Sequence, residues 1–287
     1  MIVKTVKQKI LAAYMNRNDV FMLTNLMNAF PDVKSKKEFW DNFNRAHLAL
    51  LNIPVTPLPP PCLSDISKTA IAHISTIENT DAFQHHFGGV KYSFQNVELA
   101  SLQPIQMFVN SESQTDAPST KQSKALLNYC FPKDMSVEAD LFHTQTGVRC
   151  ITSRYGLGPN NVIRKIKFGN VSFSIEHPNY LQVVRVELTN NSGQLIDRTL
   201  ILNGTHRAYE LLKAGHVKVP AMVYQVTDLQ TLTAQIPQGP GMFTTDFLIN
   251  NPRPALLNDF ISELAIDSYG LIVPSILDIN ISTIKFQ

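Results

Sequence analysis

A five-residue turn carries the groups of this sequence that could do chemistry. It reads Asn203-Gly204-Thr205-His206-Arg207, between an apolar run and a helical pattern. Basic side chains at the start of a helix meet the positive end of its macrodipole, at a cost of roughly 0.3–1 kcal/mol each. An anion would remove that cost, because free backbone N–H groups, a glycine that admits a ligand to the main chain and a forked arginine donor together make a phosphate pocket.

The same turn also has a purely structural interpretation. In that interpretation Asn203 or Thr205 caps the helix, Gly204 makes the turn, and the two basic side chains are solvated or paired with a carboxylate. The residue types alone leave both interpretations open.

Hydrophobic patterning predicts the elements around the turn. Two strands, Leu181 to Leu188 and Arg198 to Leu202, are predicted to form a hairpin, since the Asn-Asn-Ser-Gly segment between them tolerates positive φ. The second strand leads directly into the turn. A short helix then ends at Gly215, and a further strand follows through residues 219–223, Val-Pro-Ala-Met-Val.

Strand, turn, helix and strand in this order resemble the signature of the ParB/sulfiredoxin superfamily. There a strand leads into a Gly-x-His-Arg-like turn, and the helix and strand after it complete a nucleotide-phosphate site. The free-serine kinases of the superfamily carry a similar Asp-Gly-His-x-Arg turn. The resemblance implies that the site binds the phosphates of ATP, ADP or CTP, with the Thr205 hydroxyl as a ligand of Mg²⁺. The phosphate-binding residues would be Asn203, Gly204, Thr205, His206 and Arg207.

An upstream decapeptide, residues 97–106, extends this resemblance. It reads Val-Glu-Leu-Ala-Ser-Leu-Gln-Pro-Ile-Gln and is similar to the opening segment of such domains, a short strand and a Leu-x-Pro turn followed by a polar residue that faces the nucleotide. Gln106 takes the place of that polar residue, so it is a predicted nucleotide contact. An insertion at about 111–179 must separate this segment from the turn.

Departures from the family patterns narrow the chemistry. Sulfiredoxins use a cysteine where this sequence has Thr205, and DNA-clamping ParB proteins usually have a second basic residue where Ala208 stands. The serine kinases have an upstream catalytic glutamate, for which Glu98 and Glu112 are the nearest candidates. Gln106 can orient a nucleotide but cannot accept a proton as a base. Binding is therefore expected to survive these substitutions better than catalysis.

The composition of the 287 residues is typical of a globular protein, with 44% apolar and 17% charged residues. A formal net charge of +2 gives no global field that would attract DNA or an anionic membrane. Three widely spaced cysteines suit reduced thiols, and the lysines among the first ten residues argue against a secretory signal. We therefore expect a cytoplasmic protein without a membrane span.

The expected fold class is α+β, in three parts. Residues 1–88 are predicted to form a helical amino-terminal module. Residues 89–235 would form a ParB/sulfiredoxin-like mixed-sheet domain with the insertion, and residues 236–287 an extension packed on it. In this extension Arg253 either pairs with Asp259 or contacts a substrate carboxylate. The helices predicted in the first part are Val3 to Leu11, Val20 to Met27, Phe39 to Leu50, and one that Ser64-Asp65 caps and that runs to Ile77.

Two functions of different classes are expected from these observations. The first is a nucleotide-phosphate-binding protein, extending to an NTP hydrolase or a kinase with a small-molecule acceptor. The alternative is a non-enzymatic DNA-associated or partner-binding adaptor that keeps the fold. If Arg207 faces the ligand, Arg207→Ala is expected to abolish nucleotide binding and to leave the melting temperature nearly intact.

Overall fold

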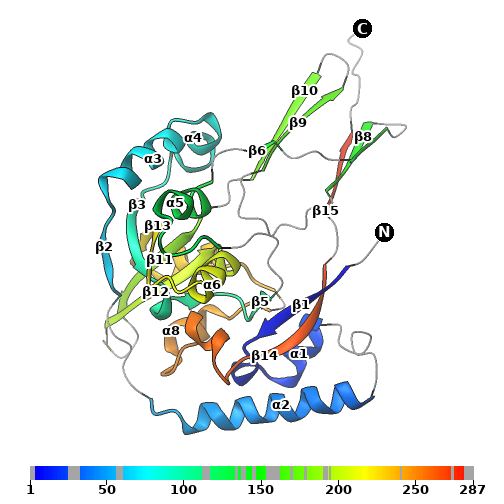
Figure 1. Cartoon of the computed structure of the whole chain (residues 1–287), viewed down its shortest axis with the longest axis vertical. Coiled ribbons are helices and arrows are strands. Elements are labelled where there is room, and N and C mark those ends of the chain that lie inside the picture. The colour runs from blue at the N-terminus through cyan, green and yellow to red at the C-terminus, as the bar shows by residue number, and fades with distance from the viewer. Residues whose placement is uncertain are drawn as a thin grey trace.

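The computed structural model is a mixed α+β fold (Figure 1). It describes residues 4–24, 33–55, 61–111, 117–132, 135–136, 140–143, 147–152, 162–168, 171–177, 180–189, 193, 195–239, 241–272 and 275–280.

A curled mixed sheet of six strands forms the centre of the fold. The predicted hairpin is confirmed, because β11 and β12 pair antiparallel, with Val184 opposite Leu200. β11 also pairs parallel with β13, and the short β4 pairs parallel with the end of β12. The strands in spatial order are β2 (Leu63–Asp65), β3 (Ser93–Glu98), β13 (Lys218–Val226), β11 (Gln182–Thr189), β12 (Leu195–Asn203) and β4 (Gln103–Pro104).

Three helices lie together beside β3 and β13 in Figure 1, namely α3 (Lys68–Glu78), α4 (Asp81–Phe87) and α5 (Ser123–Cys130). An aromatic cluster packs around them, formed by Phe83, Phe87, Tyr92, Phe94, Phe131 and Tyr180. The prediction that Ser64 and Asp65 cap α3 is wrong. Ser64 and Asp65 lie in β2, and the Ser67 hydroxyl accepts from the Ala70 N–H instead.

A second sheet joins distant parts of the chain in the order β14 (Ile266–Ile272), β1 (Lys4–Ile10) and β5 (Phe108–Asn110). The helix predicted at Val3 to Leu11 is therefore wrong. Val6, Gln8 and Ile10 are buried while Lys7 is exposed, which is the two-residue period of a strand. Each of the three predicted parts of the chain contributes one strand to this sheet.

The helix predicted at Phe39 to Leu50 is confirmed, and the one predicted at Val20 to Met27 is confirmed as far as Thr24, since residues 25–27 lie outside the described residues. Both α1 (Arg17–Thr24) and α2 (Val33–Asn52) pack against β14 of the second sheet. α2 also packs against a 3₁₀ turn, η1 (Ala12–Tyr14). Phe39, Phe43 and Ala46 form the buried stripe of α2. Within the described part of the chain, no helix has both the length and the apolar character that crossing a membrane requires.

Short helices follow β12 and β13 along the chain. α6 (Thr205–Lys213) packs against β5 and against two 3₁₀ turns, η2 (Leu99–Ser101) and η3 (Leu257–Ile261). The sequence analysis missed α7 (Leu229–Gln235) and α8 (Thr245–Asn250), although Asp228 and Thr244 cap them through side-chain oxygens.

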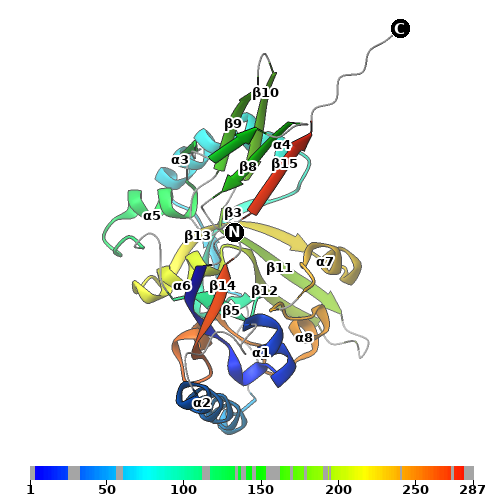
Figure 2. The same cartoon turned by 90° about the vertical axis from the view of Figure 1, so that its right-hand side faces the viewer.

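Two small sheets come mainly from the predicted insertion, and Figure 2 shows them at the end of the molecule opposite α2. One contains β6 (Met135–Ser136), β9 (Val162–Phe168) and β10 (Val171–His177). The other contains β7 (Asp140–His143), β8 (Gly147–Thr152) and β15 (Ser275–Asn280). The sequence predicts strands at Val148 to Thr152, at Val162 to Ile166 and, from the alternation of apolar and polar residues, from Leu277 onward. All three are confirmed over their described residues.

Candidate functional site

The predicted turn connects β12 to α6. Gly204 has φ 90° and ψ 22°, the left-handed conformation that favours glycine. It is the N-cap residue of α6, and no side chain caps the helix. Neither Asn203 nor Thr205 therefore has the capping role of the structural interpretation. Asn203 ends β12 opposite Gln182, and Thr205 is buried in the first turn of α6.

Gly204 lies closely against the start of β11. A Cβ at this position would stand 3.1 Å from Leu181 Cδ1 and 3.3 Å from Leu181 Cα. The backbone thus needs glycine here for its conformation and for its close approach to Leu181.

The end of α6 agrees with the prediction at Gly215. This residue has φ 86°, and its N–H donates to the Leu212 carbonyl at 3.0 Å. The His216 N–H donates to the Leu211 carbonyl at 3.0 Å, which completes a Schellman motif. α6 is therefore a nine-residue helix that begins after Gly204 and ends in a Schellman motif at Gly215.

Gln106 reaches the turn from the upstream segment, as the sequence predicts. The parallel pairing of Gln103 with Leu200 and of Pro104 with Ile201 carries the chain toward the start of α6. The Gln106 Nε2 atom lies 3.0 Å from His206 Nδ1, a contact between residues 100 positions apart. Two segments that the insertion separates in sequence therefore meet at this site.

His206 is not the exposed cation that the sequence suggests. Burial lowers the pKa of its imidazole from 6.5 to about 4, so the ring is neutral at pH 7. The Phe108 ring stands edge-on to the imidazole, with centroids 6.0 Å apart. The His206 Nε2 atom is buried and has no hydrogen-bond partner among the described residues. One nitrogen of the imidazole is therefore buried without a partner in the described part of the chain.

Arg207 points into the protein, and its residue is only 5% exposed. Its Nη1 donates to the Cys130 carbonyl at 3.3 Å, and its guanidinium lies 6.0 Å from the centre of the Tyr129 ring. Burial lowers the pKa of Arg207 to about 10, so the side chain keeps its charge at neutral pH. The prediction that its removal would leave stability intact conflicts with this packing.

The two candidate bases are not brought to the turn. Glu98 ends β3 opposite Lys218, which follows the carboxyl-terminal end of α6, whereas His206 lies in the first turn of that helix. Glu112 lies outside the described residues. Of the two candidates, the structure thus places only Glu98, and it places Glu98 away from the turn.

Gln103 is a residue that the sequence analysis did not single out. Only 1% of it is exposed, and neither Oε1 nor Nε2 has a hydrogen-bond partner among the described residues. A buried amide without partners is uncommon in folded proteins. The only signal in the sequence is its place in the segment that also carries Gln106.

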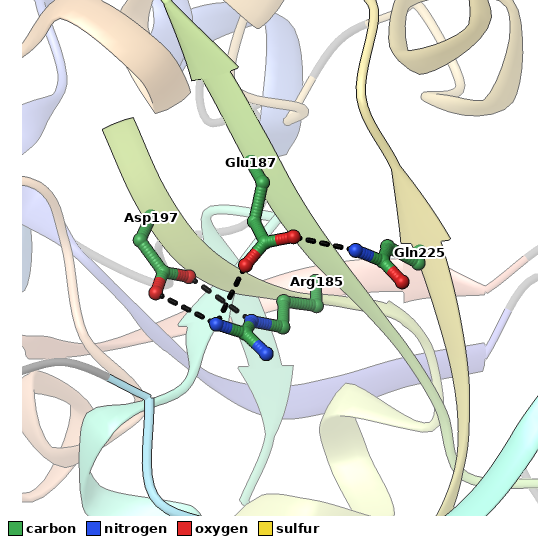
Figure 3. A network of polar contacts seen from close by, with 4 residues as sticks. All are labelled: Arg185, Glu187, Asp197 and Gln225. Carbon is green, nitrogen blue, oxygen red and sulfur yellow. Dashed lines mark hydrogen bonds and ion pairs between the residues drawn. The ribbon is translucent and has the colours of Figure 1, made fainter. Parts of the chain in front are cut away.

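A second polar cluster, also unpredicted, spans the central sheet (Figure 3). Arg185 donates from Nε and Nη2 to the two oxygens of Asp197, at 3.2 Å and 3.0 Å, and Nη2 lies 2.7 Å from Glu187 Oε1. Gln225 donates to the other oxygen of Glu187. Because one guanidinium engages both carboxylates, the cluster links β11, β12 and β13 and leaves neither carboxylate available as a base.

The turn suits an anion better than a metal ion. Its described donors are backbone N–H groups and an imidazole nitrogen, and Thr205 adds one hydroxyl. Across the described residues, no group of three or more histidine, cysteine, aspartate or glutamate side chains is arranged to hold a metal. Thr205, the residue expected to contact Mg²⁺, is buried in the first turn of α6.

Comparison with known proteins adds no relative, since no family model, curated protein or solved structure matches this chain. The assignment of function therefore rests on the geometry of the site.

Proposed function

We propose that this protein binds a nucleotide through its phosphates at the start of α6, in a fold of the ParB/sulfiredoxin type. The contact between Gln106 and His206 carries the proposal. It supports the arrangement that the resemblance implies, in which the upstream segment faces the Gly-x-His-Arg-like turn. The order of β12, Gly204, α6 and β13 supports it as well.

The proposed phosphate contacts come from the backbone and from one side chain. The first N–H groups of an α-helix have no partner within the helix, and here no side chain caps them. Gly204 has no side chain to block an approach to them, and His206 adds its buried nitrogen. Arg207 contributes positive charge without contacting the ligand, because its guanidinium is hydrogen-bonded to the Cys130 carbonyl of α5.

The proposal is for binding first, and for hydrolysis or transfer only second. A phosphoryl transfer enzyme needs a group that orients or deprotonates the acceptor. Glu98 lies at the other end of α6, so it does not serve that role in this arrangement. ATP, ADP and CTP are the ligands to test.

Thermal shift measurements test binding. The purified protein is heated with ATP, ADP, CTP or GTP, each with and without Mg²⁺, because a ligand that binds only the native state adds about 2.7 kcal/mol at a hundredfold excess over its Kd. We expect a rise in Tm with at least one nucleotide. No rise with any of them would overturn the proposal.

Two variants locate the site. His206→Asn keeps an acceptor near the position of Nδ1 and removes the distal nitrogen, so it should weaken nucleotide binding with little change in fold. His85→Asn, in an exposed position on α4, is the matched control and should bind as the original protein does. Equal affinities of the two variants would place the nucleotide elsewhere.

The burial of Arg207 favours a second candidate, the DNA-associated or partner-binding adaptor. A guanidinium engaged with the Cys130 carbonyl stabilises the fold without any ligand. In that case no nucleotide should shift Tm. DNA binding with a steep dependence on salt concentration would then identify the adaptor.

A further inference from the structure

We infer that Gln106 is a positioning residue that holds His206 as the neutral tautomer with its proton on Nε2, so that the site presents an uncharged N–H donor to an acceptor oxygen. The inference rests on the proposed function only for the identity of the ligand. The tautomer itself follows from the contacts of Gln106.

The orientation of the Gln106 amide follows from the Phe108 carbonyl. The Gln106 Nε2 atom lies 2.9 Å from Phe108 O. A backbone carbonyl only accepts hydrogen bonds, so the atom that faces it must be the amide nitrogen. The flipped amide would set two oxygens against each other. The assignment of nitrogen and oxygen in this amide is therefore determined by chemistry.

The second contact of the same nitrogen determines the tautomer of His206. An amide nitrogen carries two protons and no acceptor site, and one proton is used on Phe108 O. The other points to His206 Nδ1 at 3.0 Å. Nδ1 must then be the acceptor, and in a neutral imidazole the proton lies on Nε2.

The surroundings of His206 favour the same neutral form. Protonation of Nδ1 would set two donors face to face, and burial also lowers the pKa of the ring. Charged side chains of α6 and of the sheet that contains β5 have partners of their own: Arg207 on α5, Glu210 with Lys213 at 3.3 Å, and Lys9 of β1 with Asp267 of β14 at 3.1 Å.

The proton on Nε2 implies the chemistry of the ligand. A buried N–H without an acceptor costs free energy, and native proteins rarely leave one unsatisfied. The buried Nε2 atom of His206 lacks an acceptor among the described residues. A phosphoryl oxygen accepts hydrogen bonds and donates none when ionised, so it fits this donor. A neutral donor also keeps the same charge from about pH 8 to pH 5, unlike an imidazolium.

Nuclear magnetic resonance of the full chain with ¹⁵N-labelled histidine tests the tautomer directly. Long-range ¹H–¹⁵N spectra distinguish a protonated ring nitrogen from an accepting one, and loss of one signal set in His206→Gln identifies His206 among the eight histidines. We expect an accepting Nδ1 and a protonated Nε2 throughout the range from about pH 8 to pH 5. A proton on Nδ1 at neutral pH would overturn the inference.

Two variants of Gln106 separate positioning from packing. Gln106→Glu replaces the donor with an acceptor, so the proton should move to Nδ1 or the ring should become charged at pH 7. Gln106→Met keeps a similar volume without a donor, so both tautomers should appear. Unchanged spectra in two folded variants would show that Gln106 does not control the tautomer; if neither variant folds, the spectra of the original protein still decide.

Ligand titration keeps the two proposals apart. Inorganic phosphate and then ATP are added to the labelled protein, and the ¹⁵N signal of His206 Nε2 is followed, because this nitrogen gives a signal in either tautomer. A shift of this signal in the expected tautomer supports both proposals. The expected tautomer without a shift removes the phosphate site and keeps the role of Gln106. A shift together with a proton on Nδ1 keeps the phosphate site and removes the role of Gln106.

Discussion

His206 and Arg207 are neighbours in sequence, yet α6 directs them to different parts of the molecule, because successive helical residues point about 100° apart. His206 faces Gln106 and Phe108, whereas Arg207 faces the end of α5. Burial lowers the pKa of both side chains, but only the imidazole becomes neutral at pH 7. The two side chains therefore differ in state: the imidazole beside Gln106 is neutral, and the guanidinium beside the Cys130 carbonyl keeps its charge.

Replacement of Arg207 should destabilise the protein. Arg207→Ala removes the hydrogen bond to the Cys130 carbonyl and the contact with Tyr129, and we expect a loss of about 2–3 kcal/mol. Urea denaturation measures it. Arg45→Ala, at an exposed position on α2, is the control and should stay within about 0.5 kcal/mol of the original. Equal stabilities of the two variants would contradict the burial of Arg207.

His206 should make the fold sensitive to mild acid. Its folded pKa of about 4 lies below the ordinary 6.5, so the unfolded chain takes up the proton first as pH falls. Stability should be full above about pH 6.5 and decline toward pH 4, by on the order of 3 kcal/mol in all. Urea denaturation at several pH values should show a weaker decline in His206→Gln. Parallel curves for the two proteins would count against a buried neutral imidazole.

At the scale of elements, the junction of β12 and α6 depends on Gly204. Gly204→Ala forces alanine into the left-handed conformation, which costs about 1–2 kcal/mol of stability. It also places the new Cβ 3.1 Å from Leu181 Cδ1. Gly193→Ala is a matched control, since Gly193 has φ 79° but nothing within 4 Å of the added carbon. We expect Gly204→Ala to lose clearly more stability by urea denaturation. Equal losses would mean that Leu181 yields without cost.

Local signals were enough to predict the elements that position the site. Glycines at 204 and 215 bracket α6, and alternating apolar residues mark β11 and β12. The same kind of signal is present for α7 at Asp228, but no helix was predicted there. The contact of Gln106 with the turn could be predicted from the resemblance, although no periodicity in the sequence implies it.

Other features depend on partners that sequence patterns do not reveal. The spacing of Val3, Val6 and Ile10 suits a helix as well as a strand, and β14 and β5, far along the chain, decide for the strand. Arg207 is buried because the Cys130 carbonyl at the end of α5 lies beside it. The state of His206 depends on the Phe108 carbonyl through Gln106. In each case, contacts with segments far away in the sequence determine the structure. The residue types alone suggested a helix for β1 and exposure for Arg207 and His206.

At the scale of the whole molecule, a hydrogen bond ties the two ends of the chain together. The Tyr14 hydroxyl donates to Asp259 Oδ2 at 2.7 Å across 245 positions, and the predicted partner Arg253 lies 4.0 Å from the other carboxylate oxygen. Tyr14→Phe should cost about 1–2 kcal/mol in thermal or urea unfolding, because Asp259 is buried. Tyr269→Phe, on an exposed tyrosine, should change little. If Tyr14→Phe left the free energy of unfolding unchanged, the hydrogen bonds of Asp259 would be satisfied without the Tyr14 hydroxyl.

The sheet of β14, β1 and β5 has a consequence for how the protein is made. Ile10 pairs with Phe108 and with Ile266, so its longer partner strand is translated 256 residues after it (266 − 10). At about 5–20 residues per second, roughly 13–50 seconds pass between the two. Until β14 is made, the described strands offer β1 no partner but the three-residue β5, so the buried face of β1 needs protection from other nascent chains. Chaperones that hold unfolded chains on the ribosome would therefore matter most for the amino-terminal strand.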